Sequence, residues 1–210
     1  MSTQIQYSYN NFGPFLFKIK LPDDLISKLL DEGNKSKLSA NDTLAGHLDN
    51  QFHYSQDFKS WFYNEMSTYF AIYRQEHCKF HGLQNLPIEL EGLNLWINFM
   101  QAGDYNPLHS HGGDYSFVIY LDVPDEIHEE ARNFEGTDMK PGAIKFVFTQ
   151  ESSPRWATTD VRHVPKTGDM FIFPALLMHY VAPFKSNVTR ISVSGNIRMA
   201  NRSSLPDNYF

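Results

Sequence analysis

Cysteine is almost absent from this sequence, since Cys78 is the only one among 210 residues. A single thiol excludes a disulfide within the chain, so we expect a reducing, cytoplasmic location. No run approaches the roughly 20 apolar residues of a membrane span, and no basic segment followed by an apolar one opens the chain, so we expect neither a membrane anchor nor a signal peptide. Basic residues are also few. At a net charge of −6, the chain lacks the lysine and arginine field that non-specific nucleic-acid binding requires.

The residues that are present describe an ordinary globular protein. Hydrophobic residues make up 41% of the chain and aromatic residues 15%. This is enough apolar material for one domain with its own core, and the aromatic content favours β-rich structure or helices packed flat on a sheet.

Helical patterns occupy the N-terminal part. The segment "LPDDLISKLLDEG" (21–33) has a proline and two aspartates at its start and a glycine at its end, which are helix boundary signals. The segment "DFKSWFYNEMSTYFAIYRQEH" (57–77) predicts one longer helix, because aromatic residues recur at three- and four-residue steps. We interpret this aromatic stripe as a packing surface.

From about residue 91 the period changes to that of strands. Alternation predicts strands over 93–100, 115–123, 143–149, 169–175 and 189–199. The segments 124–142 and 151–169 are predicted to be loops, and residues 124–140 and 151–166 within them are candidate lids over a site. Many short strands indicate a sandwich or a jelly-roll barrel, with the helices covering one outer face of the larger sheet.

Three histidines are candidate metal ligands. His109 and His111 precede a predicted strand and are two residues apart, so both can point to one side. Two polar residues in a surface loop would give the same sequence pattern. His179 follows an apolar strand, where the alternative is a core histidine bound to a backbone carbonyl. A catalytic metal site with open positions needs such a third ligand.

The last predicted strand carries Arg190 and Ser192 on its polar side. If that side faces the interior, the buried guanidinium needs an anionic partner, and its planar fork suits a carboxylate, to which the serine hydroxyl adds a bond. If that side faces solvent, Arg190 is an ordinary surface residue.

Taken in order, these motifs resemble a known family. The pieces are "LWIN" (95–98), "HSHGGDYSFVIYLDVP" (109–124), "KTGDMFIFPALLMHYVAPF" (166–184) and "TRISVSGNI" (189–197). They are similar to the 2-oxoglutarate/Fe(II)-dependent oxygenases, above all to prolyl-hydroxylase-like members of bacteria and phages. The resemblance implies a mainly β fold with N-terminal helices, built on a double-stranded β-helix (jelly-roll, cupin-like) core. It also implies a single oxygenase domain over 1–210, in which 1–90 is mostly helical support and 91–200 is the core.

The resemblance also implies the chemistry of the site. His109, His111 and His179 would hold Fe(II), and Arg190 and Ser192 would bind the distal carboxylate of the cosubstrate 2-oxoglutarate. Asn98 and Tyr120 are candidate partners for its proximal carboxylate, with an ordinary interior hydrogen bond as the alternative for each.

The sequence departs from the family pattern at the second ligand. His111 replaces the usual carboxylate, which removes one negative charge from the site. Asp114 is an alternative source of a carboxylate, if the chain loops back across Gly112 and Gly113.

The implied reaction consumes O2 and 2-oxoglutarate, releases succinate and CO2, and hydroxylates a C–H bond of an unknown primary substrate, either a peptide side chain or a small molecule. Two alternatives stay open on the sequence. One is a catalytically degenerate jelly-roll binding or structural module, and the other is a three-histidine cupin dioxygenase that does not use 2-oxoglutarate.

Overall fold

The computed structural model describes residues 11, 13–85, 88–137, 139–148 and 159–200. The strands are β1 (Phe17–Lys20), β2 (Leu38–Ser39), β3 (Gln51–His53), β4 (Leu90–Met100), β5 (Asn106–His109), β6 (Tyr115–Asp122), β7 (Ile144–Val147), β8 (Asp160–His163), β9 (Asp169–Pro174), β10 (Met178–Val181) and β11 (Arg190–Met199). The helices are α1 (Asp23–Gly33), α2 (Gln56–Glu65), α3 (Ser67–His81) and α4 (Asp125–Arg132), with a 3₁₀ turn at Asn41–Thr43.

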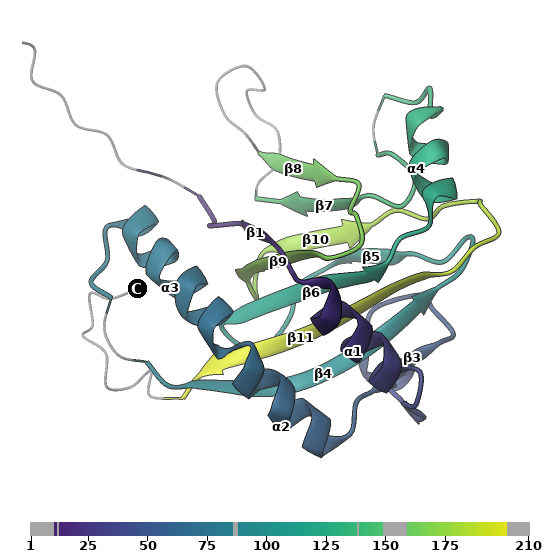
Figure 1. Ribbon diagram of the computed structural model, residues 1–210. Coiled ribbons are helices and arrows are strands. Elements are labelled where there is room, and N and C mark those ends of the chain that lie inside the picture. The colour runs from purple at the N-terminus through teal and green to yellow at the C-terminus, as the bar shows by residue number, and fades with distance from the viewer. Residues whose placement is uncertain (1–10, 12, 86–87, 138, 149–158, 201–210) are drawn as a thin grey trace, which may run out of the picture.

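The strands form two antiparallel sheets that face each other (Figure 1). The larger sheet has the order β1-β9-β6-β11-β4-β3-β2, and the smaller sheet has the order β5-β10-β7-β8. From β4 to β11 the chain passes repeatedly between the two sheets, which is the path of an eight-stranded jelly roll. The predicted mainly β fold with a jelly-roll core is confirmed.

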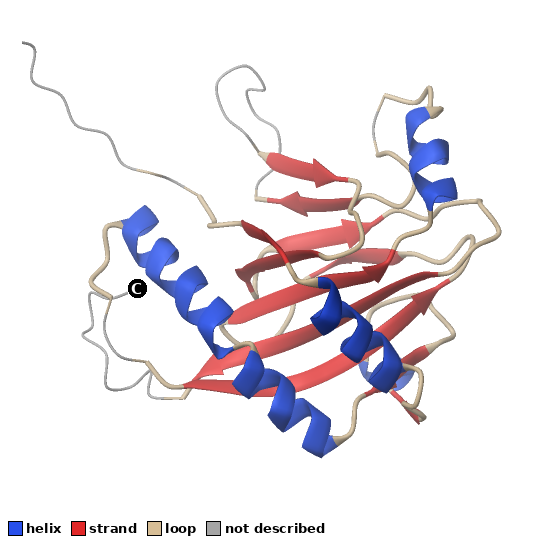
Figure 2. Ribbon diagram, viewed as in Figure 1, coloured by secondary structure: helices blue, strands red, loops and turns tan. Residues whose placement is uncertain are grey.

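Helices α1, α2 and α3 cover the outer face of the larger sheet (Figure 2). Aromatic rings of α2 and α3 pack on this face, where Phe62 and Phe70 each lie with their ring centroid 5.5 Å from that of Phe117 on β6. The aromatic stripe is therefore a packing surface, as its spacing predicts. A second apolar cluster, which includes Phe146 and Phe173, lies between the sheets.

The prediction of one long helix is wrong, because the stripe is divided between α2 and α3 at Met66. Met66 is fully buried in the core of helices and sheet, so both helices turn about one anchored side chain while keeping their aromatic faces on the sheet.

Two predicted loops contain regular structure. Segment 124–142 includes α4, whose Ile127 and Ala131 are four residues apart and buried on one face. Segment 151–169 includes β8, while the residues of its first part, 151–158, lie outside the described residues. The N-terminal part is less purely helical than expected, since β1, β2 and β3 extend the larger sheet. The single-domain organisation stays a prediction. Every helix that the structure describes is too short or too polar to span a lipid bilayer.

Candidate metal and cosubstrate site

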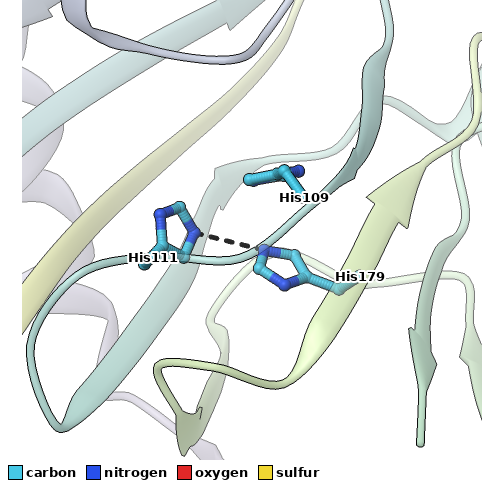
Figure 3. A group of neighbouring side chains, drawn as sticks. All are labelled: His109, His111 and His179. Carbon is cyan, nitrogen blue, oxygen red and sulfur yellow. Dashed lines mark hydrogen bonds between the residues drawn. The ribbon is translucent and has the colours of Figure 1, made fainter. Parts of the chain in front are cut away.

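The three predicted histidines come together between the sheets (Figure 3). His109 ends β5, and His179 lies directly opposite it on β10, which is a separate strand and not the end of the preceding one. His111 lies just after β5, where its backbone N–H donates to the carbonyl of Ala175. One ring nitrogen from each histidine lies within 4.8 Å of the others. No second group of three metal-ligating side chains occurs among the described residues.

Backbone carbonyls orient two of these rings. The Nδ1 of His109 lies 2.7 Å from the carbonyl oxygen of Pro107, and the Nδ1 of His179 lies 2.9 Å from that of Leu177. A carbonyl only accepts, so both Nδ1 atoms carry the proton, and both Nε2 atoms keep a free lone pair. The Nε2 atoms of His179 and His111 are 3.2 Å apart, so both could bind the same ion.

The site also keeps its histidines uncharged. Burial, followed by the positive charge that its two histidine neighbours would carry, lowers the pKa of His111 to about 3. Burial lowers the pKa of His179 to about 4 and that of His109 to below its ordinary value. Metal binding requires neutral imidazole, so all three rings are ready to bind an ion at neutral pH. This donor set of three imidazole nitrogens fits Fe(II).

Asp114 does not belong to this group. Its carboxylate accepts a hydrogen bond of 2.8 Å from the backbone N–H of Met199, at the far end of β11. The alternative in which Asp114 replaces His111 in the cluster therefore receives no support from the geometry.

Arg190, Ser192, Tyr120 and Asn98 line the same narrow cavity as the histidines, which has a volume of about 50 Å³. Ser192 is paired with Asn98 on β4 and with Tyr120 on β6, so three strands present these side chains in one row. The polar side of the last strand thus faces the interior, and Arg190 is only 3% exposed.

The buried guanidinium of Arg190 has only neutral partners. It donates to the carbonyl of Gly142 at 2.8 Å and to the sulfur of Met100 at 2.7 Å, and it lies over the ring of Tyr120. No carboxylate of the described residues forms an ion pair with it, and burial lowers its pKa. Its Nε and the hydroxyl of Tyr120 are buried without a hydrogen-bond partner in the described part of the chain. Two unused donors beside a buried cation fit a carboxylate ligand.

Asn98 differs from the other three, because both ends of its amide have protein partners. Its Oδ1 accepts from Gln51 at 2.7 Å, and its Nδ2 lies 3.4 Å from the hydroxyl oxygen of Ser192. Asn98 is placed to orient Ser192.

The sequence-based prediction of the site does not include several residues of the cavity wall, among them Gly46, Gln51 and Asn106. Gly46 and Gln51 come from the segment between β2 and β3 and from β3 itself, and Asn106 lies at the start of β5. No local motif marks them. The described residues of segment 124–140, which is predicted as a lid, do not line this cavity.

A family model described as "Putative 2OG-Fe(II) oxygenase" matches residues 94–196, a range that contains all three histidines, Arg190 and Ser192. Over this range the chain matches the 2-oxoglutarate/Fe(II)-dependent oxygenases. It is therefore an enzyme that uses iron and 2-oxoglutarate, and the predictions of activity and cofactors are confirmed. No curated protein matches the sequence.

Several solved structures share the fold of this oxygenase. The viral collagen prolyl hydroxylase of Paramecium bursaria chlorella virus-1, in its 2OG complex, has a TM-score of 0.56 at 15% identity, covering 88% of this chain and 96% of that one. A prolyl-4-hydroxylase of Pseudomonas putida has a TM-score of 0.54 at 15% identity, with 89% and 93% covered. HygX of Streptomyces hygroscopicus, with nickel and 2-oxoglutarate bound, has a TM-score of 0.52 at 10% identity, with 89% and 83% covered. At these identities the likeness concerns the fold alone.

Proposed function

We propose that His109, His111 and His179 are the iron ligands of this oxygenase. The observation that supports this most directly is the convergence of one nitrogen from each ring, with two Nε2 lone pairs held inward by backbone carbonyls. The cluster contains no carboxylate, so the bound ion keeps its full positive charge until an anionic cosubstrate arrives.

Arg190 and Ser192 would bind the distal carboxylate of 2-oxoglutarate, and the hydroxyl of Tyr120 would donate a further hydrogen bond. Support comes from the unused Nε of Arg190 and the unused hydroxyl of Tyr120 in the cavity that the histidines line. Burial raises the pKa of Tyr120 to about 12, so its hydroxyl stays protonated and able to donate. In this proposal Asn98 acts through Ser192, which its amide orients.

Bound iron, with O2 and 2-oxoglutarate, supplies the oxidising power that hydroxylates a C–H bond and leaves succinate and CO2. The chain contributes a buried cavity in which aromatic rings beside two of the histidines keep water away from the reacting groups. The ring of Trp96 lies 6.0 Å from that of His111, and the ring of Phe173 lies 4.9 Å from that of His179.

The primary substrate would be a peptide side chain or a small molecule. The relatives named as prolyl hydroxylases make a peptidyl proline one candidate for this chain. The cytoplasmic location expected from the composition stays a prediction.

Anaerobic titration with Fe(II) and then 2-oxoglutarate tests the ligand assignment. We expect a weak visible charge-transfer band that is lost in His179→Ala and kept in His128→Ala, since His128 lies on α4 outside the cavity. Succinate release is then measured with and without candidate substrates. A band that survives in His179→Ala contradicts the ligand set. Metal binding without succinate release indicates the degenerate module, and O2 consumption independent of 2-oxoglutarate indicates the cupin dioxygenase.

A further inference from the structure

Two hydrogen-bond acceptors in the cavity have no donor. The side-chain carbonyl oxygens of Gln51 and Asn106 are shielded from solvent and accept no hydrogen bond in the part of the chain that the structure describes. Both residues line the cavity that the three histidines and Arg190 line. Leaving a buried acceptor unpaired costs about 1–3 kcal/mol, so each such atom in a native site calls for a partner.

The orientation of the Gln51 amide is set by its neighbours. The Nδ2 of Asn98 lies 3.5 Å from the backbone carbonyl oxygen of Ser192, which can only accept. Asn98 therefore turns its Oδ1 toward Gln51, and Gln51 donates its Nε2 to that oxygen at 2.7 Å. The Oε1 of Gln51 is left as a buried acceptor without a donor among the described residues.

Gly46 packs directly against the amide of Asn106 and leaves no room for a side chain of its own. A methyl group on its Cα would lie 2.2 Å from the Oδ1 of Asn106 and 3.3 Å from the Nε2 of Gln51. We call Gly46, Gln51 and Asn106 the amide corner. It lies in the same cavity as the iron ligands but is built from β3, β5 and the segment before β3, none of which carries Arg190.

The cosubstrate cannot supply the missing donors. At neutral pH 2-oxoglutarate is a dianion with two carboxylates and a keto group, so it carries acceptors and no N–H or O–H. A carboxylate placed against two carbonyl oxygens would be repelled. The amide corner is therefore complementary to a different molecule that enters the same cavity, and in this reaction that molecule is the primary substrate.

We propose that the amide corner is the specificity site for the primary substrate, and that it accepts hydrogen bonds from an N–H or O–H group of that substrate. This inference rests on the proposed function, since it assumes that 2-oxoglutarate occupies the Arg190 side of the cavity. The substrate class it selects is amides, amines or alcohols whose oxidised C–H bond lies close to such a donor. Compounds that offer only acceptors at that position are excluded.

Acetamide and acetone form a matched pair of probes, because they have nearly the same shape and differ by one NH2 against one CH3. Each is titrated by NMR into the 2-oxoglutarate complex with zinc in place of iron, since Fe(II) broadens nearby signals. The indole N–H of Trp96, which lines the cavity, and the side-chain amides of Gln51 and Asn106 report binding. We expect acetamide to bind roughly four- to 100-fold more tightly than acetone, because it can donate to both carbonyl oxygens and each hydrogen bond contributes roughly two- to tenfold.

The variants separate the amide corner from general cavity effects. Asn106→Leu and Gln51→Met should each reduce the preference for acetamide by roughly two- to tenfold. Gly46→Ala should also reduce it, because a methyl group 2.2 Å from the Oδ1 of Asn106 forces that amide out of position. Gln101→Leu is the control, because its amide lies at the surface and contacts Thr189, and it should keep the full preference.

Equal binding of the two probes, or no saturable binding of either, overturns the inference when the wild-type protein binds 2-oxoglutarate. Failure of the wild-type protein to bind 2-oxoglutarate overturns the proposed function instead. A preference for acetamide that persists in both Asn106→Leu and Gln51→Met also contradicts the inference, and Asn106→Leu is the deciding variant if Gln51→Met fails to fold.

Discussion

Replacing Arg190 by methionine should change the binding of 2-oxoglutarate and the stability of the protein in opposite directions. Methionine keeps an unbranched side chain of similar length and removes the charge. In the absence of ligand, the guanidinium of Arg190 is buried with a carbonyl, a sulfur and an aromatic ring as its partners, and with no carboxylate among the described residues. A buried charge in this state is a cost to folding that a bound carboxylate offsets.

The magnitudes follow from this arrangement. Loss of one partner of a buried, hydrogen-bonded charge pair costs about 2–4 kcal/mol, which is a roughly 30- to 1,000-fold weaker affinity for 2-oxoglutarate. Replacing a buried charge by an apolar side chain is neutral or stabilising by about 1–3 kcal/mol. The carbonyl of Gly142 loses its donor in the variant, which reduces that gain.

Two measurements test this pair of effects. Anaerobic titration of the charge-transfer band gives the dissociation constant of 2-oxoglutarate, and urea denaturation of the metal-free protein gives the free energy of unfolding. Arg198→Met is the matched control, because Arg198 lies on the same strand but is exposed and paired with Glu91. An unchanged affinity in Arg190→Met refutes the carboxylate assignment. A decrease of several kcal/mol in the free energy of unfolding contradicts the predicted cost of the buried charge and shows that Arg190 stabilises the fold.

Three further predictions concern other parts of the molecule. His111→Asp restores the carboxylate of the family pattern and should keep Fe(II) binding. His111→Ala should weaken Fe(II) binding by more than the roughly 10- to 100-fold that follows loss of a residue hydrogen-bonded to a metal ligand. Equal metal affinity of the two variants contradicts a ligand role for His111. Burial lowers the pKa of His77 to about 4 from 6.5, so the unfolded chain gains a proton first as the pH falls. The free energy of unfolding, measured by urea denaturation, should then decline more steeply between pH 6.5 and 4 in the wild type than in His77→Phe. An equal decline in the two proteins contradicts this. Phe62→Ala should lower that free energy by about 3–5 kcal/mol, against less than about 1 kcal/mol for the exposed Ile72→Ala, and similar losses would show that the helices are not anchored through Phe62.

The faces of the core strands were predictable from the sequence. In β4 the apolar Leu95 and Ile97 alternate with Trp96 and Asn98, and the structure buries the first pair under the helices and turns the second pair into the cavity. Alternation in a strand is local, because successive side chains point to opposite faces whatever the partner strand is. The same reasoning placed Arg190 and Ser192 on one side, but it could not say whether that side faces solvent.

Other features depended on distant contacts. The division of the aromatic stripe at Met66 follows the way two helices fit one sheet, and no boundary signal in the sequence marks it. The isolation of Asp114 from the histidines depends on its bond to Met199, a residue 85 positions later.

By itself, the sequence determined which residues can do the chemistry, namely His109, His111, His179 and Arg190. It also determined their order along the chain and the strand pattern of the segments around them. Tertiary structure decided which of them meet, and it added Gln51 and Asn106 to the same cavity. The physical reason is register. The row from Gln51 through Asn98 and Ser192 to Tyr120 spans four strands, and its alignment comes from hydrogen bonds between segments far apart in the chain. Such pairing is decided by the packing of the whole sheet, so no local pattern reports it.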